Sequence, residues 1–413
     1  MAEPLVIVGA SYAGLNAALA ARAAGHDGAI LLLGDETSLP YQRPPLSKGF
    51  MLGKVAESAL PIRPQLALDN NRIEFLPGTR VTAIDRTARA VETSTGKRIP
   101  YGRLILATGC RARALPATGG ELAGIHYLRT LEDARRLRQE AHDAQAVAIV
   151  GGGFIGLEVA ASLASLGKPV TVVEAQDRLL ARAVPPPFSE FLAAVHRRAG
   201  VRILFNTTMK ALRGDAGRVQ AAELSDGSSC PADLVLVGIG AIANTELAAK
   251  AGLTCEDGIV VDEFARTSDP LITAAGDCTR FPTRFAPGPA RLESVQNAQD
   301  QAHTAATTAA GQLKPYDAVP WFWSDQYDLK LHMVGLSQGH DRMVTRGSPE
   351  ERKFSLFYFK AGALIAIDSV NRAGDHMAGR HLIGSSTAVS ADQISDPAFD
   401  LAAVVKSMRK GTR

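Results

Sequence analysis

Two glycine-rich segments, each between a short apolar run and an alanine- and leucine-rich stretch, constrain the fold of this chain more than any other feature. The first is Val-Ile-Val-Gly-Ala-Ser-Tyr-Ala-Gly at 6–14, and the second is Val-Ala-Ile-Val-Gly-Gly-Gly-Phe-Ile-Gly at 147–156. A strand that enters a helix through a tight glycine turn presents free backbone amides and the positive helix end to a pyrophosphate. Two such turns predict two dinucleotides held against each other, as electron transfer between them requires.

An acidic residue follows each turn after a second apolar run, where a dinucleotide site needs one. The first run leads to Asp35 and Glu36, and the second ends at Glu174. A carboxylate about 20 residues beyond the turn accepts hydrogen bonds from ribose hydroxyls. The alternative, that the glycines only pack a strand on a helix, weighs more at the first turn. Ser11 stands there in place of the middle glycine, so its side chain must point away from the phosphates.

Glu174 also bears on the choice of nucleotide. An NADP site usually places Arg or Lys where it meets the 2′-phosphate. Glu174 and Asp177 would face that phosphate with negative charge, so the sequence favours NADH. Arg178 and Arg182 follow in the same loop and leave the preference open.

The composition is that of a globular protein and excludes several classes. The 413 residues suggest two or three domains, with 46% hydrophobic and 21% charged residues. A net charge of +3 is too small to indicate nucleic-acid binding, and no apolar run is long enough for a membrane span. Cys110, Cys230, Cys255 and Cys278 form no Cys-x-x-Cys pair, so neither a metal site nor a dithiol centre is predicted. The scattered cysteines and the lack of a signal segment predict a cytoplasmic protein.

Hydrophobic periodicity predicts how the rest of the chain is organised. The β-α-β pattern restarts at residue 146, and the apolar run at 271–277 is expected to return to the first unit. Alternating apolar residues at 354–358 and 364–367 predict an antiparallel sheet, and 402–408 a final helix.

Three residues are candidates for contact with a flavin. Asp277 by itself reads as a turn or helix-cap aspartate, but beside two nucleotide units it is expected to bind a ribityl hydroxyl. Lys48 by itself reads as a solvated loop lysine, and Glu158 as a residue that favours the helix dipole. The sharper hypothesis pairs Lys48 with Glu158 near flavin N5, where hydride arrives, so that the pair offsets the charge of a reduced flavin.

Both tryptophans of the chain lie in the stretch Trp-Phe-Trp-Ser-Asp at 321–325. In a strand, Trp321 and Trp323 share one face and Phe322 occupies the other. Ordinary core packing is one interpretation. The other is that one tryptophan covers the flavin on the side away from the nicotinamide.

Seven motifs in order carry a resemblance to a known family. They are Gly-x-Ser-x-x-Gly at 9–14, Arg-Pro-Pro-Leu-Ser-Lys at 43–48, Ala-Thr-Gly at 107–109, Leu-Arg-Thr-Leu-Glu-Asp at 128–133, Gly-Gly-Gly-Phe-Ile-Gly-Leu-Glu at 151–158, Asp-Pro-Leu-Ile-Thr-Ala-Ala-Gly-Asp at 269–277 and Pro-Trp-Phe-Trp-Ser-Asp-Gln at 320–326. The chain resembles the FAD- and NADH-dependent ferredoxin reductases of bacterial oxygenase systems. Within them it resembles putidaredoxin reductase and its relatives, which serve cytochromes P450.

The resemblance covers essentially the whole chain and implies an α/β, glutathione-reductase-like fold with two dinucleotide-binding domains and a C-terminal α+β domain. The implied segments are the first part of an FAD-binding domain at 1–111, an NAD-binding domain at 112–241, the second part of the FAD-binding domain at 242–320, and a C-terminal domain with an antiparallel sheet at 321–413.

The resemblance also implies the residues that contact the cofactors. The FAD contacts fall on Ala13, Asp35 (rather than Glu36), Lys48, Val81, Arg129, Asp277 and Val295. The NAD contacts fall on Gly151, Gly153, Ile155, Gly156, Glu158, Glu174 and Gly240. The remaining cofactor-binding candidates are Gly9, Ser11, Gly14, Arg43, Ala107 and Arg182. Lys48, Glu158 and the flavin-proximal Trp323 are the candidate catalytic residues.

The implied activity is an NADH-dependent ferredoxin reductase. Electrons would pass through FAD to an acidic [2Fe-2S] ferredoxin that supplies a cytochrome P450. The alternatives are a reductase for a Rieske-type ring-hydroxylating dioxygenase and a rubredoxin or quinone reductase. A disulfide reductase would need a cysteine pair, and a redox-signalling flavoprotein would carry targeting or basic nucleic-acid-binding segments.

An acidic partner calls for a basic docking rim. Two clusters are candidates: Arg280, Arg284 and Arg291 in a loop, and Lys406, Arg409, Lys410 and Arg413 in the tail. His303 stands where the resembled reductase has a basic docking residue, so partner preference is expected to differ.

Overall fold

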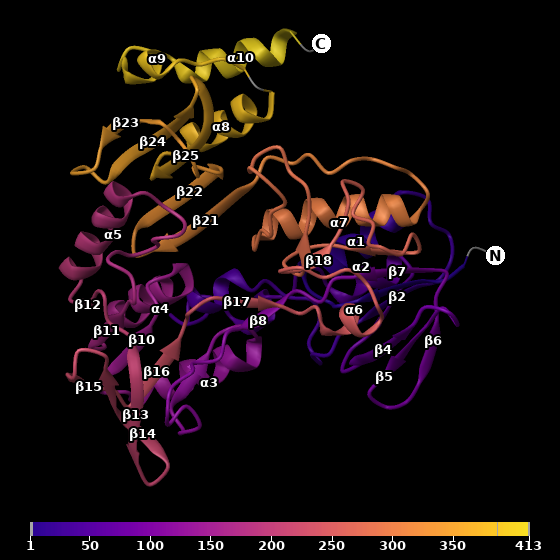
Figure 1. Cartoon of the computed structure of the whole chain (residues 1–413), viewed down its shortest axis with the longest axis horizontal. Helices are drawn as coiled ribbons and strands as arrows, with labels where there is room; N and C mark the ends of the chain where they lie inside the picture. The colour runs from indigo at the N-terminus through magenta and orange to yellow at the C-terminus, as the bar shows by residue number, and fades with distance from the viewer. Residues whose placement is uncertain (1–2, 386, 412–413) are drawn as a thin grey trace.

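The structure, a computed structural model, describes residues 3–385 and 387–411. Two parallel α/β units lie side by side, and an antiparallel sheet with its helices covers one end of the second unit (Figure 1). The predicted fold class is confirmed.

The first unit is built on a parallel sheet in the order β19-β7-β1-β2-β3. Its strands are β1 (Leu5–Val8), β2 (Ile30–Leu33), β3 (Ile73–Leu76), β7 (Arg103–Leu106) and β19 (Ile272–Ala274). Because β19 pairs with β7, the run at 271–277 does return to the first unit. Helices α1 (Tyr12–Ala23) and α7 (Val295–Ala309) lie together on one face (Figure 1), and β4 (Val81–Asp85), β5 (Ala90–Thr93) and β6 (Arg98–Pro100) pack on the other.

The second unit repeats this plan in the order β12-β11-β10-β16-β9, again with all strands parallel. The strands are β9 (Ile125–Tyr127), β10 (Val147–Val150), β11 (Val170–Val173), β12 (Arg202–Leu204) and β16 (Leu234–Val237). The helices are α3 (Leu131–Asp143), α4 (Phe154–Ser165) and α5 (Pro186–Arg198), and β13 (Met209–Asp215), β14 (Arg218–Leu224) and β15 (Ser229–Pro231) form a small antiparallel sheet. Helix α3 begins at a capping box of Thr130 and Asp133, a Thr-x-x-Asp signal that is legible in the sequence.

Two short antiparallel strands, β8 (Cys110–Ala112) and β17 (Ala241–Ala243), carry the chain between the units. Beside them the Thr108 hydroxyl donates to the Asn244 carbonyl at 2.7 Å, and the Asn244 amide donates to the Thr108 carbonyl at 2.9 Å. We propose that the domain boundaries lie here, at 111/112 and 241/242, and at 320/321 before the C-terminal sheet.

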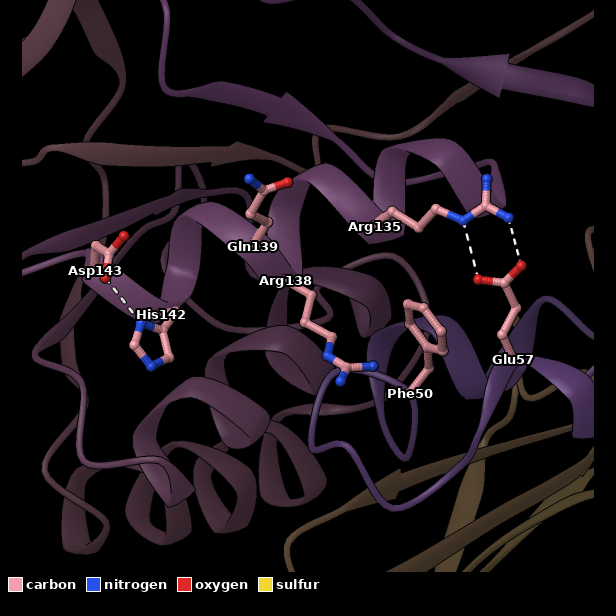
Figure 2. Close-up of a pocket in the computed structure, with 7 residues that line it drawn as sticks. All are labelled: Phe50, Glu57, Arg135, Arg138, Gln139, His142 and Asp143. Atoms are coloured by element: carbon pink, nitrogen blue, oxygen red, sulfur yellow. Dashed lines mark hydrogen bonds and ion pairs between the residues drawn. The ribbon is translucent and has the colours of Figure 1, made fainter.

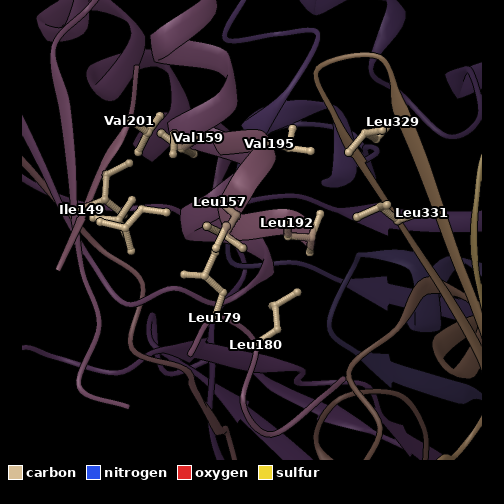
Figure 3. Close-up of a cluster of buried hydrophobic side chains, with 14 of the residues drawn as sticks. Ile149, Leu157, Val159, Leu179, Leu180, Leu192, Val195, Val201, Leu329 and Leu331 are labelled. Carbon is tan, nitrogen blue, oxygen red and sulfur yellow. The ribbon is translucent and has the colours of Figure 1, made fainter. Parts of the chain in front are cut away.

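The C-terminal unit is an antiparallel sheet in the order β21-β22-β25-β24-β23. Its strands are β21 (Trp321–Gln326), β22 (Leu329–Gly335), β23 (Arg342–Ser348), β24 (Lys353–Lys360) and β25 (Ala363–Val370), and its helices are α8 (Ala373–Ser385), α9 (Ala391–Ser395) and α10 (Leu401–Gly411). Both the antiparallel sheet and the final helix were predicted. Leu329 and Leu331 of β22 share a buried cluster with Leu192 and Val195 of α5, so this sheet packs directly on the second unit (Figure 3).

The remaining short elements lie in the connections. They are the 3-10 turns η1 (Pro44–Ser47) and η2 (Glu57–Ala59), the helices α2 (Gln65–Asn70) and α6 (Glu246–Lys250), and the strands β18 (Ile259–Val260) and β20 (Thr279–Arg280).

Candidate functional site

The first glycine turn requires glycine at both of its ends. Gly9 has a φ of +111°, and a Cβ on it would lie 2.1 Å from the Ala107 carbonyl oxygen. A Cβ on Gly14 would lie 1.7 Å from the Gly9 oxygen. Ser11 precedes α1 without capping it, and its hydroxyl accepts from Arg43 Nε at 3.2 Å. The serine is therefore accommodated through Arg43, and the amides that begin α1 receive no side-chain cap.

The second turn has the same construction. A Cβ on Gly151, which has a φ of +103°, would lie 2.4 Å from the Gly238 oxygen, and one on Gly156 would lie 2.3 Å from the Gly151 oxygen. Gly153 precedes α4 and provides no side-chain cap. Two strand-to-helix turns with uncapped helix N-termini fit the pyrophosphates of two dinucleotides. Ile155, in the first turn of α4, is 44% exposed, a large apolar side chain available to a nucleotide.

The acid of the second unit is held in place by backbone amides. Glu174 Oε2 accepts from the Gly152 amide at 2.6 Å, and its Oε1 accepts from the Gln176 amide at 2.8 Å. Its carboxylate therefore lies against the glycine turn, as a ribose contact requires. Arg178 donates to the carbonyls of Ala181 and Val184, which commits it to its own loop.

Arg182, the other arginine of this loop, lies beside Gly240, which is a predicted NAD contact. Arg182 is exposed, and a Cβ on Gly240 would lie 3.6 Å from its Nη2.

The first unit places its acid differently. The strand registers align Val8 with Leu33 and Val150 with Val173, so the counterpart of Glu174 is Gly34. A Cβ at Gly34 would approach that of Ala10 to 2.7 Å, which leaves no room for a side chain. Asp35, the next residue, is exposed, and its contact with ribose stays a prediction.

Glu36 is engaged within the protein. Its carboxylate accepts from Arg43 Nη2 at 2.7 Å and from the Tyr41 hydroxyl at 2.6 Å. Arg43 also donates to the Arg129 carbonyl, so it joins the first glycine turn, the proline-rich loop and the start of α3.

Asp277 lies in a polar cluster at the carboxyl end of the first sheet. Its Oδ2 accepts from Arg129 Nη2 at 3.0 Å and from the Cys110 thiol at 3.3 Å. Burial by itself lowers the pKa of Arg129, but the charge of Asp277, the hydrogen bond to it and other nearby acidic groups such as Glu293 together raise that pKa. Burial, followed by the charge of Asp277, raises the pKa of the Cys110 thiol, so the thiol stays protonated. The sequence signal for Cys110 was its place directly after Ala-Thr-Gly.

The other expected FAD contacts surround this cluster or lie at the ends of neighbouring elements. A Cβ on Gly276 would meet that of Ala13 at 3.0 Å, which brings α1 against Asp277. Val295 is the first residue of α7, after the cap at Ser294. Val81 begins β4, and Ala107 is buried directly after β7. These positions converge on the carboxyl edge of the first sheet, except for Val81, which lies on the antiparallel layer.

Lys48 and Glu158 form an ion pair between the proline-rich loop and α4. Lys48 Nζ lies 2.8 Å from Glu158 Oε2, and the Glu158 side chain is 1% exposed. The Ser47 hydroxyl donates to Oε2 and the Ser324 hydroxyl to Oε1, the latter at 2.6 Å. The structure thus brings together the two residues that the sequence paired, while their role beside a flavin stays a prediction. Ser47 and Ser324 were missed, although both belong to the motifs at 43–48 and 320–326.

Trp321 and Trp323 share one face of β21, as predicted. Their ring centroids lie 5.6 Å apart, and Phe322 packs on Phe154 of α4 at 4.6 Å. Arg380 stacks on the outer ring, that of Trp321, at 4.9 Å.

The arginines of the candidate basic loop form ion pairs within the protein, and the role of the loop in docking stays a prediction. Arg280 pairs with Glu256 at 2.6 Å, Arg284 with Asp317 at 2.7 Å, and Arg291 with Asp257 at 3.3 Å. Glu256, Asp257 and Asp317 come from other segments, while Arg291 also pairs with Glu293, two residues along the chain. In the tail, Lys406 is exposed, the side chains of Arg409 and Lys410 are not among those described, and Arg413 lies outside the described residues.

Two surface hollows lie apart from the candidate cofactor residues. The first, about 520 Å³, runs along α3 from Arg135 to His142, and Phe50 and Glu57 also line it (Figure 2). The second, about 490 Å³, lies between α1 and α7 and includes His303. None of the predicted cofactor contacts lines either hollow.

Comparison with known proteins identifies the family. Residues 3–302 match the family model of the pyridine nucleotide-disulphide oxidoreductases, and residues 321–405 match that of the reductase C-terminal domain. Rhodocoxin reductase of Rhodococcus erythropolis is 43% identical over 397 residues, which are 96% of this chain and 93% of that protein. The chain belongs to the putidaredoxin and rhodocoxin reductase family of ferredoxin reductases. The reductase is a ferredoxin–NAD(P)⁺ oxidoreductase, and FAD and NAD(P)H are the cofactors of its family.

Solved structures of this family have the same fold. The ferredoxin reductase for the CYP199A2 system from Rhodopseudomonas palustris is 44% identical, with a TM-score of 0.95 over 98% of this chain and 100% of that one. Putidaredoxin reductase, in its covalent complex with putidaredoxin, is 40% identical, with a TM-score of 0.95 over 98% of this chain and 99% of that one.

A relative from a different oxygenase system is equally similar in sequence. The reductase component of the anthranilate 1,2-dioxygenase system of Burkholderia cepacia is 40% identical, over 97% of this chain and 98% of that protein.

Two further observations bear on the class of reductase. All four cysteines are free, and no two of them form a Cys-x-x-Cys pair in the sequence. Within residues 3–385 and 387–411, no helix has the length and apolar character needed to cross a bilayer.

Proposed function

We propose that this reductase takes electrons from NADH and delivers them to an acidic [2Fe-2S] ferredoxin that supplies a cytochrome P450. The observation that carries the proposal is the Lys48–Glu158 pair, which joins the proline-rich loop of the FAD unit to α4, the helix that follows the glycine turn of the NAD unit. Because the pair links the two nucleotide-binding units, it fits a reaction between two bound nucleotides better than the binding of one nucleotide. The similarity to a reductase of a P450 system and to one solved with its ferredoxin supports the choice of partner.

The bound cofactors would supply the chemistry, with hydride passing from nicotinamide to flavin and single electrons leaving the flavin for the ferredoxin. The protein contributes position and charge. Glu174 would hold the NAD ribose, Asp277 the flavin ribityl chain, and Lys48 a positive charge where negative charge develops. Trp323, on the face of β21 opposite Phe322, would line the exit for electrons.

Glu174 supports NADH as the donor rather than NADPH. Both carboxylate oxygens are already oriented by backbone amides, so the group is fixed and negative where a 2′-phosphate would sit. Arg182, in the same loop and beside Gly240, is an exposed cation.

A Rieske-type oxygenase is the second candidate for the system supplied. The similarity to a dioxygenase-system reductase favours it, at an identity close to that of the P450-system reductases. We also propose a cytoplasmic location, which four unpaired cysteines support.

The experiment is NADH-driven reduction of cytochrome c, measured with and without candidate [2Fe-2S] ferredoxins from P450 and Rieske systems. Purified protein should be yellow and carry one FAD per chain. Reduction should depend on the ferredoxin, and ferricyanide reduction should not. Turnover that needs no ferredoxin, or a colourless protein that remains active, would contradict the proposal. Faster turnover with a Rieske-system ferredoxin would move the assignment to the second candidate.

A further inference from the structure

A line of buried hydrogen bonds leads away from the Lys48–Glu158 pair on the side opposite Lys48. Ser324 Oγ donates to Glu158 Oε1 at 2.6 Å and receives the Gln326 amide at 3.2 Å. Gln326 Oε1 lies 2.9 Å from His196 Nε2, and the Tyr327 hydroxyl lies 3.2 Å from His196 Nδ1. Ser324, Gln326 and His196 are each no more than 1% exposed, so the line lies inside the protein.

The chemistry of the groups gives this line a single direction. A carboxylate oxygen only accepts, so the Ser324 hydroxyl must donate to Glu158. Ser324 then accepts from the Gln326 amide, which leaves Gln326 Oε1 to accept from His196 Nε2–H. His196 is thereby the Nε2–H tautomer, and Nδ1 accepts from Tyr327. Burial lowers the pKa of His196, which agrees with a neutral ring. Every donor in the line points toward Glu158.

The line also joins elements of different units. Ser324 and Gln326 alternate on β21 and so share the face that packs on α4, while His196 belongs to α5. The contact between His196 and Gln326 spans 130 residues of sequence. Glu158 is therefore oriented from two sides, by Lys48 and Ser47 in the proline-rich loop and by Ser324 from the C-terminal sheet.

We infer that Ser324, Gln326 and His196 are positioning residues for hydride transfer. They hold the Glu158 carboxylate in the orientation in which it keeps Lys48 extended and charged toward the flavin. The inference rests on the proposed function, because it assumes that Lys48 acts beside a bound flavin. Aligned donors polarise one another, so the effect of Gln326 and His196 reaches Glu158 only through Ser324.

The test combines variants of Ser324 and Gln326 with stopped-flow reduction of the flavin by NADH. Ser324→Ala should slow reduction about tenfold, the effect of one lost hydrogen bond to a charged group. Ser324→Thr, which keeps the hydroxyl, should stay within about twofold of the parent. Gln326→Met should slow reduction about threefold, and the Ser324→Ala/Gln326→Met double variant should match Ser324→Ala alone, because the line is already cut. The KM for NADH should not change.

Ser355→Ala is the matched control. Ser355 is a fully buried serine of the same sheet, bonded to Ser369 and Asp375 rather than to this line. It should lower the unfolding temperature as Ser324→Ala does, with no change in the rate of flavin reduction. Multiplying effects of Ser324→Ala and Gln326→Met, or an unchanged rate in Ser324→Ala, would overturn the inference. A parent protein that NADH does not reduce would instead overturn the proposed function.

A second measurement does not depend on activity. The ¹⁵N spectrum of histidine-labelled protein at pH 8, with His196 assigned from its loss in His196→Asn, should show the neutral Nε2–H tautomer. Gln326→Met should move that signal, and Ser355→Ala should not. An Nδ1–H tautomer in the parent protein would remove the direction of the line and with it the inference.

Discussion

Replacing Lys48 with Met separates the structural from the functional role of the Lys48–Glu158 pair. Met keeps most of the aliphatic stem and removes the charge. Glu158 is then left as a carboxylate with a 1% exposed side chain and no counterion. Breaking a buried pair from one side costs about 3–5 kcal/mol. The hydroxyls of Ser47 and Ser324 still donate to the carboxylate, and Lys48 is 16% exposed, so the loss of unfolding free energy should be at the low end, about 3 kcal/mol.

A second substitution, Glu158→Gln, removes the stranded charge. The Lys48→Met/Glu158→Gln double variant should therefore regain all but about 1 kcal/mol of the unfolding free energy, since two neutral groups of similar shape replace the pair. The rate of flavin reduction should not recover. Loss of a charge-assisted interaction of about 1.5–3 kcal/mol with the reduced flavin lowers that rate about 10- to 100-fold in either variant.

Urea unfolding followed by circular dichroism measures the free energy of unfolding. Single-turnover stopped flow at about 450 nm, in the flavin absorption band, measures the rate of flavin reduction. FAD content is measured on both variants as the control for cofactor loss. The reasoning is refuted if the double variant recovers the reduction rate together with its stability, because the pair would then serve folding alone. It is also refuted if Lys48→Met changes neither quantity.

Three further predictions address the cofactor sites and the core. Asp277→Ala should weaken FAD retention by about 1.5–3 kcal/mol, because Arg129 and the ribityl chain lose a shared acceptor, and unchanged retention on gel filtration would contradict it. Glu174→Arg should narrow or reverse the preference for NADH, measured as kcat/KM for NADH divided by kcat/KM for NADPH. If the parent protein has equal kcat/KM values for the two nucleotides, the argument from Glu174 is wrong. Burial raises the pKa of Asp368 to about 7, so its contribution to stability is full below pH 4 and is lost as pH rises to 7, by about 4 kcal/mol in all. Asp368→Asn, which still accepts from Tyr358, should flatten this pH dependence of urea unfolding between pH 4 and 7, and an unchanged slope would count against it.

The fold could be predicted from local patterns in the sequence. The turns at Gly9 and Gly151 need glycine because a backbone carbonyl occupies the place of a Cβ, so the requirement is visible in a few residues. The apolar strands around them, and the alternation at 321–325 that puts Trp321 and Trp323 on one face, are equally local. The FAD and NAD units, the return of β19 to the first sheet and the Lys48–Glu158 pair were all predictable, the last from its motifs.

What the tertiary structure decided depends on partners that are distant in sequence. The carboxylates that pair with Arg280 and Arg284 lie in other segments, so these ion pairs could not be predicted from the loop itself. The presence of Gly34 at the position that corresponds to Glu174 depends on how closely Gly34 packs on Ala10.

The line from Glu158 to His196 depends on where the C-terminal sheet docks. The contact between Gln326 and His196 could not be predicted from the sequence, because a hydrogen bond depends on position and direction in space. The apolar surface that places them, between β22 and α5, is unspecific in its sequence. The sequence by itself thus determined the two nucleotide units and their chemistry, while only packing between units decided which polar side chains orient Glu158.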